Sequence, residues 1–309
     1  MKILVTGGAG FIGSHVADAY IALGHEVVII DNLSSGQKEN INPKAKFYHM
    51  DIQDEAVKEV FQQEKFDVIN HHAAQMDVRK SVADPKFDAR INVLGTLNLL
   101  QNGVENGVKK VIFISSGGAA YGEQEVFPAP ETHPMNPLSP YGITKLIGEK
   151  YLYFYNQTYG LQYGVLRYSN VYGPRQNPHG EAGVVAIFAM KMLSGESPVI
   201  NGEGLQTRDY VYVGDVVEAN VKVLTYEGNE AFNIGTGVET DVNEIFRNVN
   251  KLCGKNVEEK HGPGKPGEQL RSVIDNAKAK KLLDWEPKFN LAQGLEPTVE
   301  FFKKKHAAQ

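Results

Sequence analysis

The chain opens with Lys2-Ile3-Leu4-Val5-Thr6-Gly7-Gly8-Ala9-Gly10-Phe11-Ile12-Gly13, and apolar residues then recur at helical spacing as far as Leu23. An apolar run this short is typical of a buried strand, so the glycines lie between a strand and a helix. In such a turn Gly7 permits the tight bend, Gly10 lets backbone N–H groups approach a pyrophosphate, and Gly13 allows close packing of the helix. The stretch therefore predicts a dinucleotide-binding βαβ unit.

A second predicted strand, Glu26–Ile30, ends at Asp31, 18 positions after Gly13. A carboxylate at this place accepts hydrogen bonds from the adenosine ribose hydroxyls and repels a 2′-phosphate. After Asp31 the first Lys or Arg is Lys38, so we expect NAD rather than NADP. The alternative interpretation is that Asp31 and Asn32 only open a turn.

The first 175 residues alternate apolar runs with amphipathic segments. The predicted strands are Lys2–Thr6, Glu26–Ile30, Lys46–His49, Asp67–His71, Lys110–Ser115 and Tyr163–Arg167, and the predicted helices include Phe11–Leu23, Glu55–Gln63, Asp84–Asn106 and Pro140–Tyr159. This alternation favours an α/β fold with a doubly wound, Rossmann-type parallel sheet. We expect residues 1–175 to form the NAD-binding domain. Residues 176–309 are expected to form a smaller α/β substrate lobe, with the chain crossing back to the sheet.

The composition excludes several classes of protein. The 309 residues carry a net charge of −5, which argues against a general basic surface for nucleic acids or anionic membranes. The lone Cys253 allows no intramolecular disulfide, and strand-forming residues begin at Lys2, so we expect a cytoplasmic protein. His71 and His72 would point to opposite faces of a strand, and we expect no metal site.

Three residues point to proton transfer at a hydroxyl. Tyr141 and Lys145 lie four apart in a predicted helix and therefore share one face. A nearby ammonium favours the phenolate, so Tyr141 is a candidate general base. Ser116 follows a predicted strand, at the sheet edge where such folds bind ligands, and could hold the same substrate oxygen. Each feature alone also occurs by chance or as an ordinary turn.

Taken together, these motifs resemble the extended short-chain dehydrogenase/reductase family, and within it most closely the UDP-glucose (UDP-galactose) 4-epimerases. The residues that carry the resemblance are Thr6–Gly13, Asp31-Asn32, Ser115-Ser116, Tyr141 with Lys145, and Arg167-Tyr168-Ser169-Asn170-Val171-Tyr172-Gly173-Pro174. The resemblance runs from Met1 to about Phe302. It implies a tightly bound NAD, a UDP-sugar substrate and a homodimer formed by two paired helices of each subunit.

The resemblance also implies roles for individual residues. It assigns to NAD Gly7, Gly10, Phe11, Ile12, Gly13, Asp31, Asn32, Asp51, Ile52, Ala73, Ala74, Gln75, Asn92, Tyr141, Lys145 and Tyr168. It assigns to the UDP-sugar Ser116, Asn170, Gly183, Val184, Val185, Arg208, Lys265 and Ser272. Tyr141, Lys145 and Ser116 form the implied catalytic set. On its residues alone, Asp51 is equally suited to capping a following helix.

The reaction follows from what is missing beside Ser116. Similar dehydratases carry an Asp-Glu pair after this hydroxyl and similar decarboxylases a nearby Glu, whereas this chain continues Gly117-Gly118-Ala119-Ala120. Oxidation and reduction at C4 then remain, which is redox-neutral epimerisation of a UDP-hexose. The open alternatives are a 4-keto-sugar reductase, a C5-epimerase, or an NAD-sensing regulator without activity.

The width of the sugar pocket depends on one position. In similar enzymes a bulky aromatic residue there excludes an N-acetyl group and a small residue admits it. The matching residue is Ser272, so we expect UDP-GlcNAc and UDP-GalNAc to be accepted alongside UDP-glucose and UDP-galactose. The alternative is that Ser272 is an ordinary loop residue.

Overall fold

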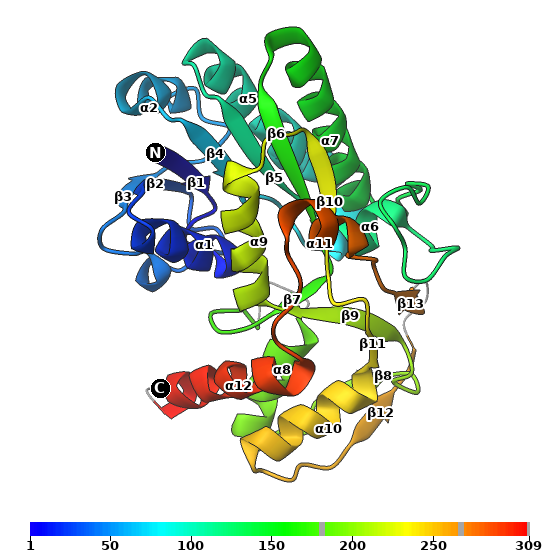
Figure 1. The fold of residues 1–309 in the computed structure, drawn as a ribbon. Helices are drawn as coiled ribbons and strands as arrows, with labels where there is room; N and C mark the ends of the chain where they lie inside the picture. Colours follow the sequence, from blue (N-terminus) through cyan, green and yellow to red (C-terminus); the bar gives the residue numbers. More distant parts are fainter. Residues whose placement is uncertain (179–182, 265–268, 308–309) are drawn as a thin grey trace.

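The computed structural model describes residues 1–178, 183–264 and 269–307. Within them, seven parallel strands form the central sheet in the order β10-β6-β5-β4-β1-β2-β3 (Figure 1). These strands are β1 (Lys2–Thr6), β2 (Glu26–Asp31), β3 (Lys46–His49), β4 (Val68–His71), β5 (Lys110–Ser116), β6 (Gln162–Tyr168) and β10 (Glu230–Ile234). The strand order reverses between β1 and β4, which is the switch point where α/β sheets of this kind bind ligands. The predicted Rossmann-type α/β fold is confirmed.

Helices cover both faces of this sheet (Figure 1). One face carries α1 (Phe11–Ala22), α9 (Val213–Thr225) and α11 (Ala277–Leu283), and the other carries α2 (Val57–Glu64), α5 (Thr96–Glu105) and α7 (Pro140–Tyr159). Two separate apolar clusters, one on each face, fill the space between helices and strands. Because both faces are buried, the strands are apolar runs rather than alternating ones.

The chain returns to the large sheet after residue 175. Strand β10 pairs with β6, and helix α9 packs against α1. Trp285 is fully buried in the same apolar cluster as α1 and α9, and its Nε1 donates to the backbone oxygen of Asp215 at 2.8 Å. Aromatic burial of this size stabilises a fold by several kcal/mol, which explains why the connection comes back to this face.

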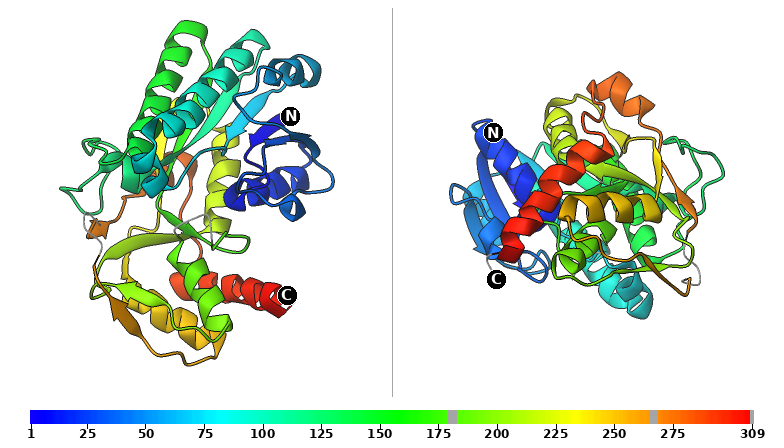
Figure 2. Two further views of the ribbon diagram at one scale, coloured as in Figure 1. Left: turned by 180° about the vertical axis from the view of Figure 1, so that it is seen from behind. Right: turned by 90° about the horizontal axis from the view of Figure 1, so that it is seen from below.

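A smaller lobe lies beyond the carboxyl edge of the sheet (Figures 1 and 2). Its helices are α8 (Val184–Leu193), α10 (Val242–Cys253) and α12 (Leu291–Ala307), and its strands are β7 (Asn170–Tyr172), β8 (Val199–Asn201), β9 (Thr207–Tyr212), β11 (Glu239–Asp241), β12 (Lys260–Gly262) and β13 (Arg271–Ser272). The three helices share a third apolar cluster. The lobe therefore has its own core and faces the ends of β1 and β5.

Most element boundaries predicted from the sequence agree with the structure to within two residues. The long helix predicted over Asp84–Asn106 differs: it consists of α4 (Pro85–Ala89), the π-helical turn Arg90–Gly95 and α5. Such wider turns insert an extra residue and re-aim side chains, often at functional sites. Two short helices, α3 (Val78–Ala83) and α6 (Gly117–Tyr121), also border the site. No helix in the described residues is long and apolar enough to cross a membrane.

Candidate active site

The glycine-rich turn joins β1 to α1 beside the switch point of the sheet. Gly7 has a φ of +69°, and a Cβ at this position would lie 2.7 Å from the backbone nitrogen of Ala73. A Cβ on Gly13 would lie 2.4 Å from the carbonyl oxygen of Gly7. The turn therefore tolerates no side chain at either position, in agreement with the tight bend predicted at Gly7 and the close packing predicted at Gly13.

Helix α1 begins without a side-chain cap. Gly10 precedes it in an extended conformation, and Phe11 and Ile12 form its first turn. The N–H groups of a first turn have no intrahelical acceptor and carry the positive end of the helix dipole. This end of the helix fits the anionic pyrophosphate of NAD.

Asp31 stands at the end of β2 with its carboxylate next to the glycine-rich turn. Its oxygens accept hydrogen bonds from the backbone nitrogens of Ala9 at 2.9 Å and Leu33 at 2.8 Å. Burial raises the pKa of Asp31, while these two N–H groups lower it. A carboxylate offers about four acceptor directions, so room remains for the ribose hydroxyls that the sequence assigns to it.

The neighbouring loop supports this end of the site. Asn32 donates from Nδ2 to Oδ2 of Asp51 at 2.7 Å. Ile52 is buried, and a Cβ on Gly95 of the π-helical turn would lie 2.6 Å from its Cδ1 atom. Asn32, Asp51 and Ile52 are thus brought together beside Asp31, where the sequence places the adenosine.

The segment Ala73–Gln75 leaves β4 and is held by Asn92. The backbone nitrogen of Gln75 donates to Oδ1 of Asn92 at 2.9 Å, and Nδ2 of Asn92 donates back to the carbonyl oxygen of Gln75 at 2.9 Å. Asn92 lies in the π-helical turn Arg90–Gly95, which aims it at this segment. The side chain of Gln75 donates to Asp88 at 2.8 Å and faces the protein interior.

Of the two histidines at the end of β4, His71 has a structural role. His71 lies between two hydroxyls, with Nδ1 at 2.7 Å from Oγ1 of Thr6 and Nε2 at 2.9 Å from Oγ1 of Thr96. Burial lowers the pKa values of His71 and His72 to about 3, so both rings are neutral at ordinary pH. Thr6 also accepts from the backbone nitrogen of Ala73, so His71 helps to fix the path of this segment.

The three predicted catalytic residues surround the end of β5. Ser116 ends that strand, and its Oγ accepts from the backbone nitrogen of Ala119 at 3.3 Å. Lys145 is buried and donates from Nζ to the carbonyl oxygen of Ile114 at 2.8 Å. The same Nζ lies 5.7 Å from the ring centroid of Tyr141, one turn earlier on α7. The lysine therefore connects α7 to the strand that carries Ser116.

Two glycines let α7 approach this strand closely. A Cβ on Gly142 would lie 2.3 Å from the carbonyl oxygen of Ala119, and one on Gly148 would lie 2.4 Å from the ring of Phe113. The first contact joins the start of α7 to α6, directly after Ser116. A larger residue at either glycine would push Tyr141 away from the strand end.

Burial shifts the proton equilibria of the catalytic pair. It lowers the pKa of Lys145 to about 8, although the carboxylates of Asp88 and Glu149 raise it. It raises the pKa of Tyr141 above its ordinary value, and the charge of Asp88 raises it further. Tyr141 is therefore a neutral phenol in the protein alone, and formation of the phenolate depends on positive charge beside the ring.

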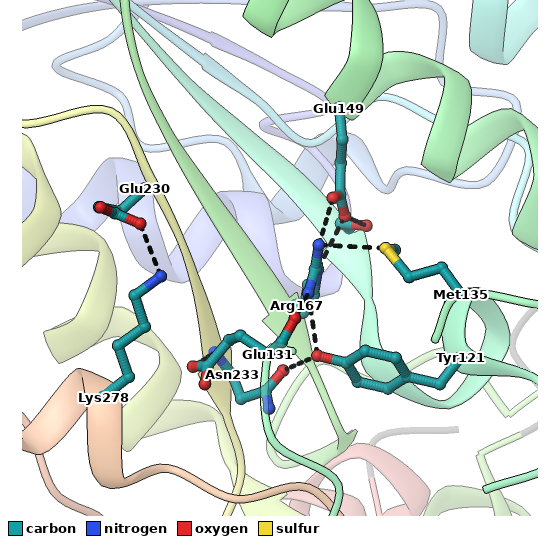
Figure 3. Close-up of polar contacts among 9 residues, drawn as sticks. Tyr121, Glu131, Met135, Glu149, Arg167, Glu230, Asn233 and Lys278 are labelled. Carbon is teal, nitrogen blue, oxygen red and sulfur yellow. Dashed lines mark hydrogen bonds and ion pairs between the residues drawn. The ribbon is translucent and has the colours of Figure 1, made fainter. Parts of the chain in front are cut away.

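A buried polar cluster centred on Arg167 of β6 packs against α7 (Figure 3). Its Nε and Nη2 atoms donate to the two carboxylate oxygens of Glu149 at 3.0 and 2.6 Å, and its Nη1 donates to the hydroxyl of Tyr121 at 3.0 Å. The side chains of the ion pair are 7% and 9% exposed. Ser115 also donates to Glu149 at 2.6 Å. This bidentate pair ties α7 to β5, β6 and α6.

The same cluster extends to Asn233 on the edge strand β10 (Figure 3). Tyr121 donates to Oδ1 of Asn233 on β10 at 2.7 Å. Nδ2 of Asn233 in turn donates to the carbonyl oxygens of Ala129 at 2.9 Å and Asp275 at 3.0 Å. A continuous series of polar contacts thus joins the catalytic helix to the segment that follows Ser272.

Ser272 and Arg208 meet at the junction of the two lobes. They are register neighbours on β13 and β9. The Oγ atom of Ser272 would be 3.1 Å from a Cβ on Gly118, two residues after Ser116, so Ser272 faces the catalytic loop. Arg208 donates to the carbonyl oxygen of Thr207 and forms no ion pair in the described part of the chain. Its guanidinium fork is therefore suited to an anionic ligand.

The hydroxyl of Tyr168 lies within the core rather than at the site. The residue pairs in register with Ser116 across β5 and β6, and its ring is buried. Its hydroxyl accepts from Nδ2 of Asn220 on α9 at 2.7 Å, inside the core beneath α1 and α9. Its backbone therefore borders the site, while its hydroxyl is used within the core.

The remaining predicted substrate residues belong to the smaller lobe. Asn170 begins β7 and is exposed. Gly183 precedes α8, which Val184 and Val185 begin, and Val185 is buried in the core of the lobe. Lys265 lies outside the described residues.

Sequence reasoning missed a second layer of residues behind the site. Asp88, Thr144 and Glu149 are charged or polar residues that contact the catalytic elements without being part of any motif. One signal was present: Glu149 follows Lys145 by four positions, so it shares the face of Tyr141. A second was Arg167 at the end of an apolar strand, because a buried guanidinium requires a carboxylate partner.

Comparisons with known proteins agree with this geometry. The profile of the NAD dependent epimerase/dehydratase family matches residues 3–235. The UDP-glucose 4-epimerase of Mycolicibacterium smegmatis is 45% identical over 311 residues, which cover 99% of each chain. The structure of a UDP-glucose 4-epimerase from Thermotoga maritima with UDP-glucose is similar at a TM-score of 0.97 and 51% identity, covering 99% of this chain and 100% of that one.

A third similar protein was solved with the cofactor. The structure of the UDP-glucose 4-epimerase of Thermus thermophilus in complex with NAD has a TM-score of 0.92 and 43% identity to this chain, with 98% and 99% of the two chains covered. Similarity at this level over the whole length includes the small lobe as well as the central sheet.

The buried ion pair gives a test by chemical unfolding. Arg167→Met leaves the Glu149 carboxylate buried without its partner, and we expect the free energy of unfolding to fall by about 3–5 kcal/mol. Arg167→Met combined with Glu149→Met removes both charges and should recover most of that loss. Arg79→Met, which breaks an exposed pair with Asp77, should cost less than about 1 kcal/mol. A loss below about 1 kcal/mol for Arg167→Met would contradict the conclusion that Arg167 is the buried partner of Glu149.

Proposed function

We propose that this chain, which belongs to the NAD dependent epimerase/dehydratase family, interconverts the C4 epimers of a UDP-hexose. The observation that carries the proposal is the placement of Ser116, Tyr141 and Lys145 around the end of β5, beside a glycine-rich turn suited to NAD. Relatives that act on or bind UDP-glucose support the choice of substrate. UDP-glucose and UDP-galactose are the expected pair.

The residues divide the work of the reaction. Tyr141 takes the proton of the sugar 4-hydroxyl and later returns it, while Ser116 holds the same oxygen by a hydrogen bond. Lys145 supplies positive charge beside the phenol and holds the nicotinamide ribose. NAD⁺, when bound, accepts the hydride from C4 and returns it to the other face of the 4-keto sugar. Arg208 anchors the diphosphate, so that the sugar can turn between the two transfers.

The surroundings of Ser116 support epimerisation over elimination. Gly117, Gly118, Ala119 and Ala120 form α6 up to Tyr121 and offer no ionisable side chain for a further proton transfer. The carboxylate of Glu149 lies next to Ser115, and its oxygens accept hydrogen bonds from Ser115 and Arg167. The chemistry left to the site is oxidation and reduction at one carbon.

The two lobes would share the ligands. We assign NAD to the domain formed by residues 1–175 and the UDP portion to residues 176–309, although β10 belongs to the large sheet. In the smaller lobe the residues proposed for UDP are Asn170 at its border, Gly183, Val184, Val185, Arg208 and Lys265.

Cys253 is the single cysteine of the chain and is buried, so it can form no intramolecular disulfide. This supports the proposal of a cytoplasmic enzyme.

The function is tested with purified protein, each of four UDP-sugars and no added NAD. NMR of the C4 epimers should show interconversion without net oxidation, since the cofactor is regenerated in each cycle. In a separate assay with NADH and a UDP-4-keto sugar, net oxidation of NADH would indicate a 4-keto-sugar reductase, and inversion at C5 in either assay would indicate a different epimerase. No reaction with any of the four sugars would contradict the proposal.

Tyr141→Phe should lower turnover by about 10²–10⁴-fold, because it removes the general base. The NAD content of the purified variant should remain that of the wild type, since the phenol is not needed to hold the dinucleotide. Tyr153→Phe is a matched control on the same helix, where the tyrosine is exposed. Activity near wild type in Tyr141→Phe would refute its assignment as the base.

The proposal includes N-acetylated substrates because of Ser272. The side chain faces Gly118 at 3.1 Å from a would-be Cβ, so it borders the loop that carries Ser116. A hydroxymethyl group is much smaller than the aromatic ring that excludes an N-acetyl group in similar enzymes. We therefore infer that the sugar pocket admits the larger 2-substituent.

Ser272→Tyr should remove activity toward UDP-GlcNAc and UDP-GalNAc and preserve activity toward UDP-glucose and UDP-galactose. Steric exclusion in a buried pocket predicts a change of at least about tenfold in the ratio of the two kcat/KM values. Ser272→Ala, which keeps the pocket open, should behave like the wild type. Full activity of Ser272→Tyr on the N-acetylated pair would overturn the pocket argument.

A second copy of this chain is the partner that we propose for the outer face of α7. Ile143, Ile147, Tyr151 and Phe154 recur along this face at helical spacing, with Ile143 45% and Phe154 48% exposed. Leu94, 56% exposed, lies in the π-helical turn just before α5, the helix that runs beside α7 (Figure 2). An apolar stripe across two adjacent helices favours four-helix packing between two subunits.

Phe154→Asp should convert the dimer into a monomer, because it places a charge within the apolar stripe. The mass in solution, measured by sedimentation equilibrium, gives the result. Leu23→Asp introduces the same charge at an exposed leucine at the end of α1 and should leave the mass unchanged. A wild-type protein that is monomeric at micromolar concentration would refute the dimer.

A further inference from the structure

Asp88 on α4 is a fully buried carboxylate surrounded by neutral donors. Its Oδ1 accepts from Nε2 of Gln75 at 2.8 Å and from Nδ2 of Asn92 at 3.1 Å, and its Oδ2 accepts from Oγ1 of Thr144 at 2.8 Å. In the described residues it forms no ion pair within 4.0 Å. A buried ionised carboxylate is costly unless positive charge lies within reach.

That positive charge is Lys145, the residue after Thr144. Titratable groups from three parts of the chain surround Lys145. They are Asp88 on α4, Tyr141 and Glu149 on α7, and His71 and His72 at the end of β4. The two histidines are neutral, because burial lowers their pKa values to about 3. Tyr141 is a neutral phenol in the protein alone.

The other carboxylate near Lys145 is already matched. Glu149 lies in a bidentate ion pair with Arg167, at 3.0 and 2.6 Å, and these two charges largely cancel at a distance. Asp88 has no such partner in the described residues, so no ion pair offsets its charge. It is the leading charge that opposes the effect of burial on the pKa of Lys145, and it also raises the pKa of Tyr141.

We propose that Asp88 is the buried counter-charge of the Tyr141–Lys145 pair, a positioning residue tied to α7 by its hydrogen bond from Thr144. The inference rests on the proposed roles of these two residues. Asp88 acts on Tyr141 and Lys145 through its charge and is not assigned to the substrate. Its hydrogen bonds to Gln75 and Asn92 also fix the segment after β4 that borders the cofactor.

The test is the titration of Tyr141 in the NAD-loaded protein. Ultraviolet difference absorbance follows the phenolate, with the same titration of Tyr141→Phe subtracted as background. In Asp88→Asn, which is nearly isosteric, the phenolate should form at a pH lower by about one unit, the effect of one buried charge several ångströms away. The alkaline limb of the pH–kcat profile should move in the same direction, since Lys145 loses its proton more easily.

Two controls separate charge from structure. Asp84→Asn makes the same change one turn earlier on an exposed side chain, and Thr144→Val removes one hydrogen bond to Asp88 while keeping its charge. Both should leave the titration of Tyr141 where it is in the wild type. An unchanged titration in Asp88→Asn, or an equal shift in Thr144→Val, would overturn the proposal.

A second measurement applies if Asp88→Asn does not fold. Lys145→Met added to Asp88→Asn removes the other charge of the proposed pair, so it should restore the lost yield and unfolding midpoint. A double variant as unstable as the single one would show that only the hydrogen bonds of Asp88 matter, and the proposal would fail. The titration requires no turnover, so its outcome is independent of whether the protein epimerises UDP-sugars.

Discussion

The close approach of α7 to the end of β5 is the constraint on which the site depends. Gly142 and Gly148 remove the side chains that would hold the helix away from Ala119 and Phe113. Lys145 then reaches the carbonyl oxygen of Ile114 inside the strand. Without this contact the phenol and the serine hydroxyl would belong to two separate elements, and no shared substrate oxygen could lie between them.

The buried groups around the contact between α7 and β5 include several charged side chains. Two carboxylates lie behind one lysine, but Arg167 neutralises Glu149, whereas Asp88 is surrounded by neutral donors. Glu149 and Arg167 therefore form a structural ion pair, whereas the charge of Asp88 acts on Tyr141 and Lys145. This charge also explains how a lysine with a pKa lowered by burial can stay cationic.

The contacts between the large sheet and the smaller lobe lie beside the candidate catalytic residues. Asn233 on the last strand of the large sheet binds the backbone of Ala129 and Asp275, and Ser272 borders Gly118. The residue that would set the width of the sugar pocket is thereby in register with Arg208, the candidate for the diphosphate. A substitution at these contacts in either lobe would therefore alter the surroundings of Ser116.

The sequence alone predicted the parallel sheet, most strand limits, the glycine-rich turn and the pairing of Tyr141 with Lys145. These features depend on local periodicity and on contacts a few residues apart, which a sequence displays directly. The sequence did not predict the π-helical turn that aims Asn92, because inserting one residue into a helix leaves the apolar pattern almost unchanged. The hydrogen bond of Asp88 with Thr144 and the ion pair of Arg167 with Glu149 also remained outside the prediction, since these partners lie 56 and 18 positions apart and only folding makes them neighbours. The sequence determined which groups do the chemistry, and the tertiary structure decided which charges surround them.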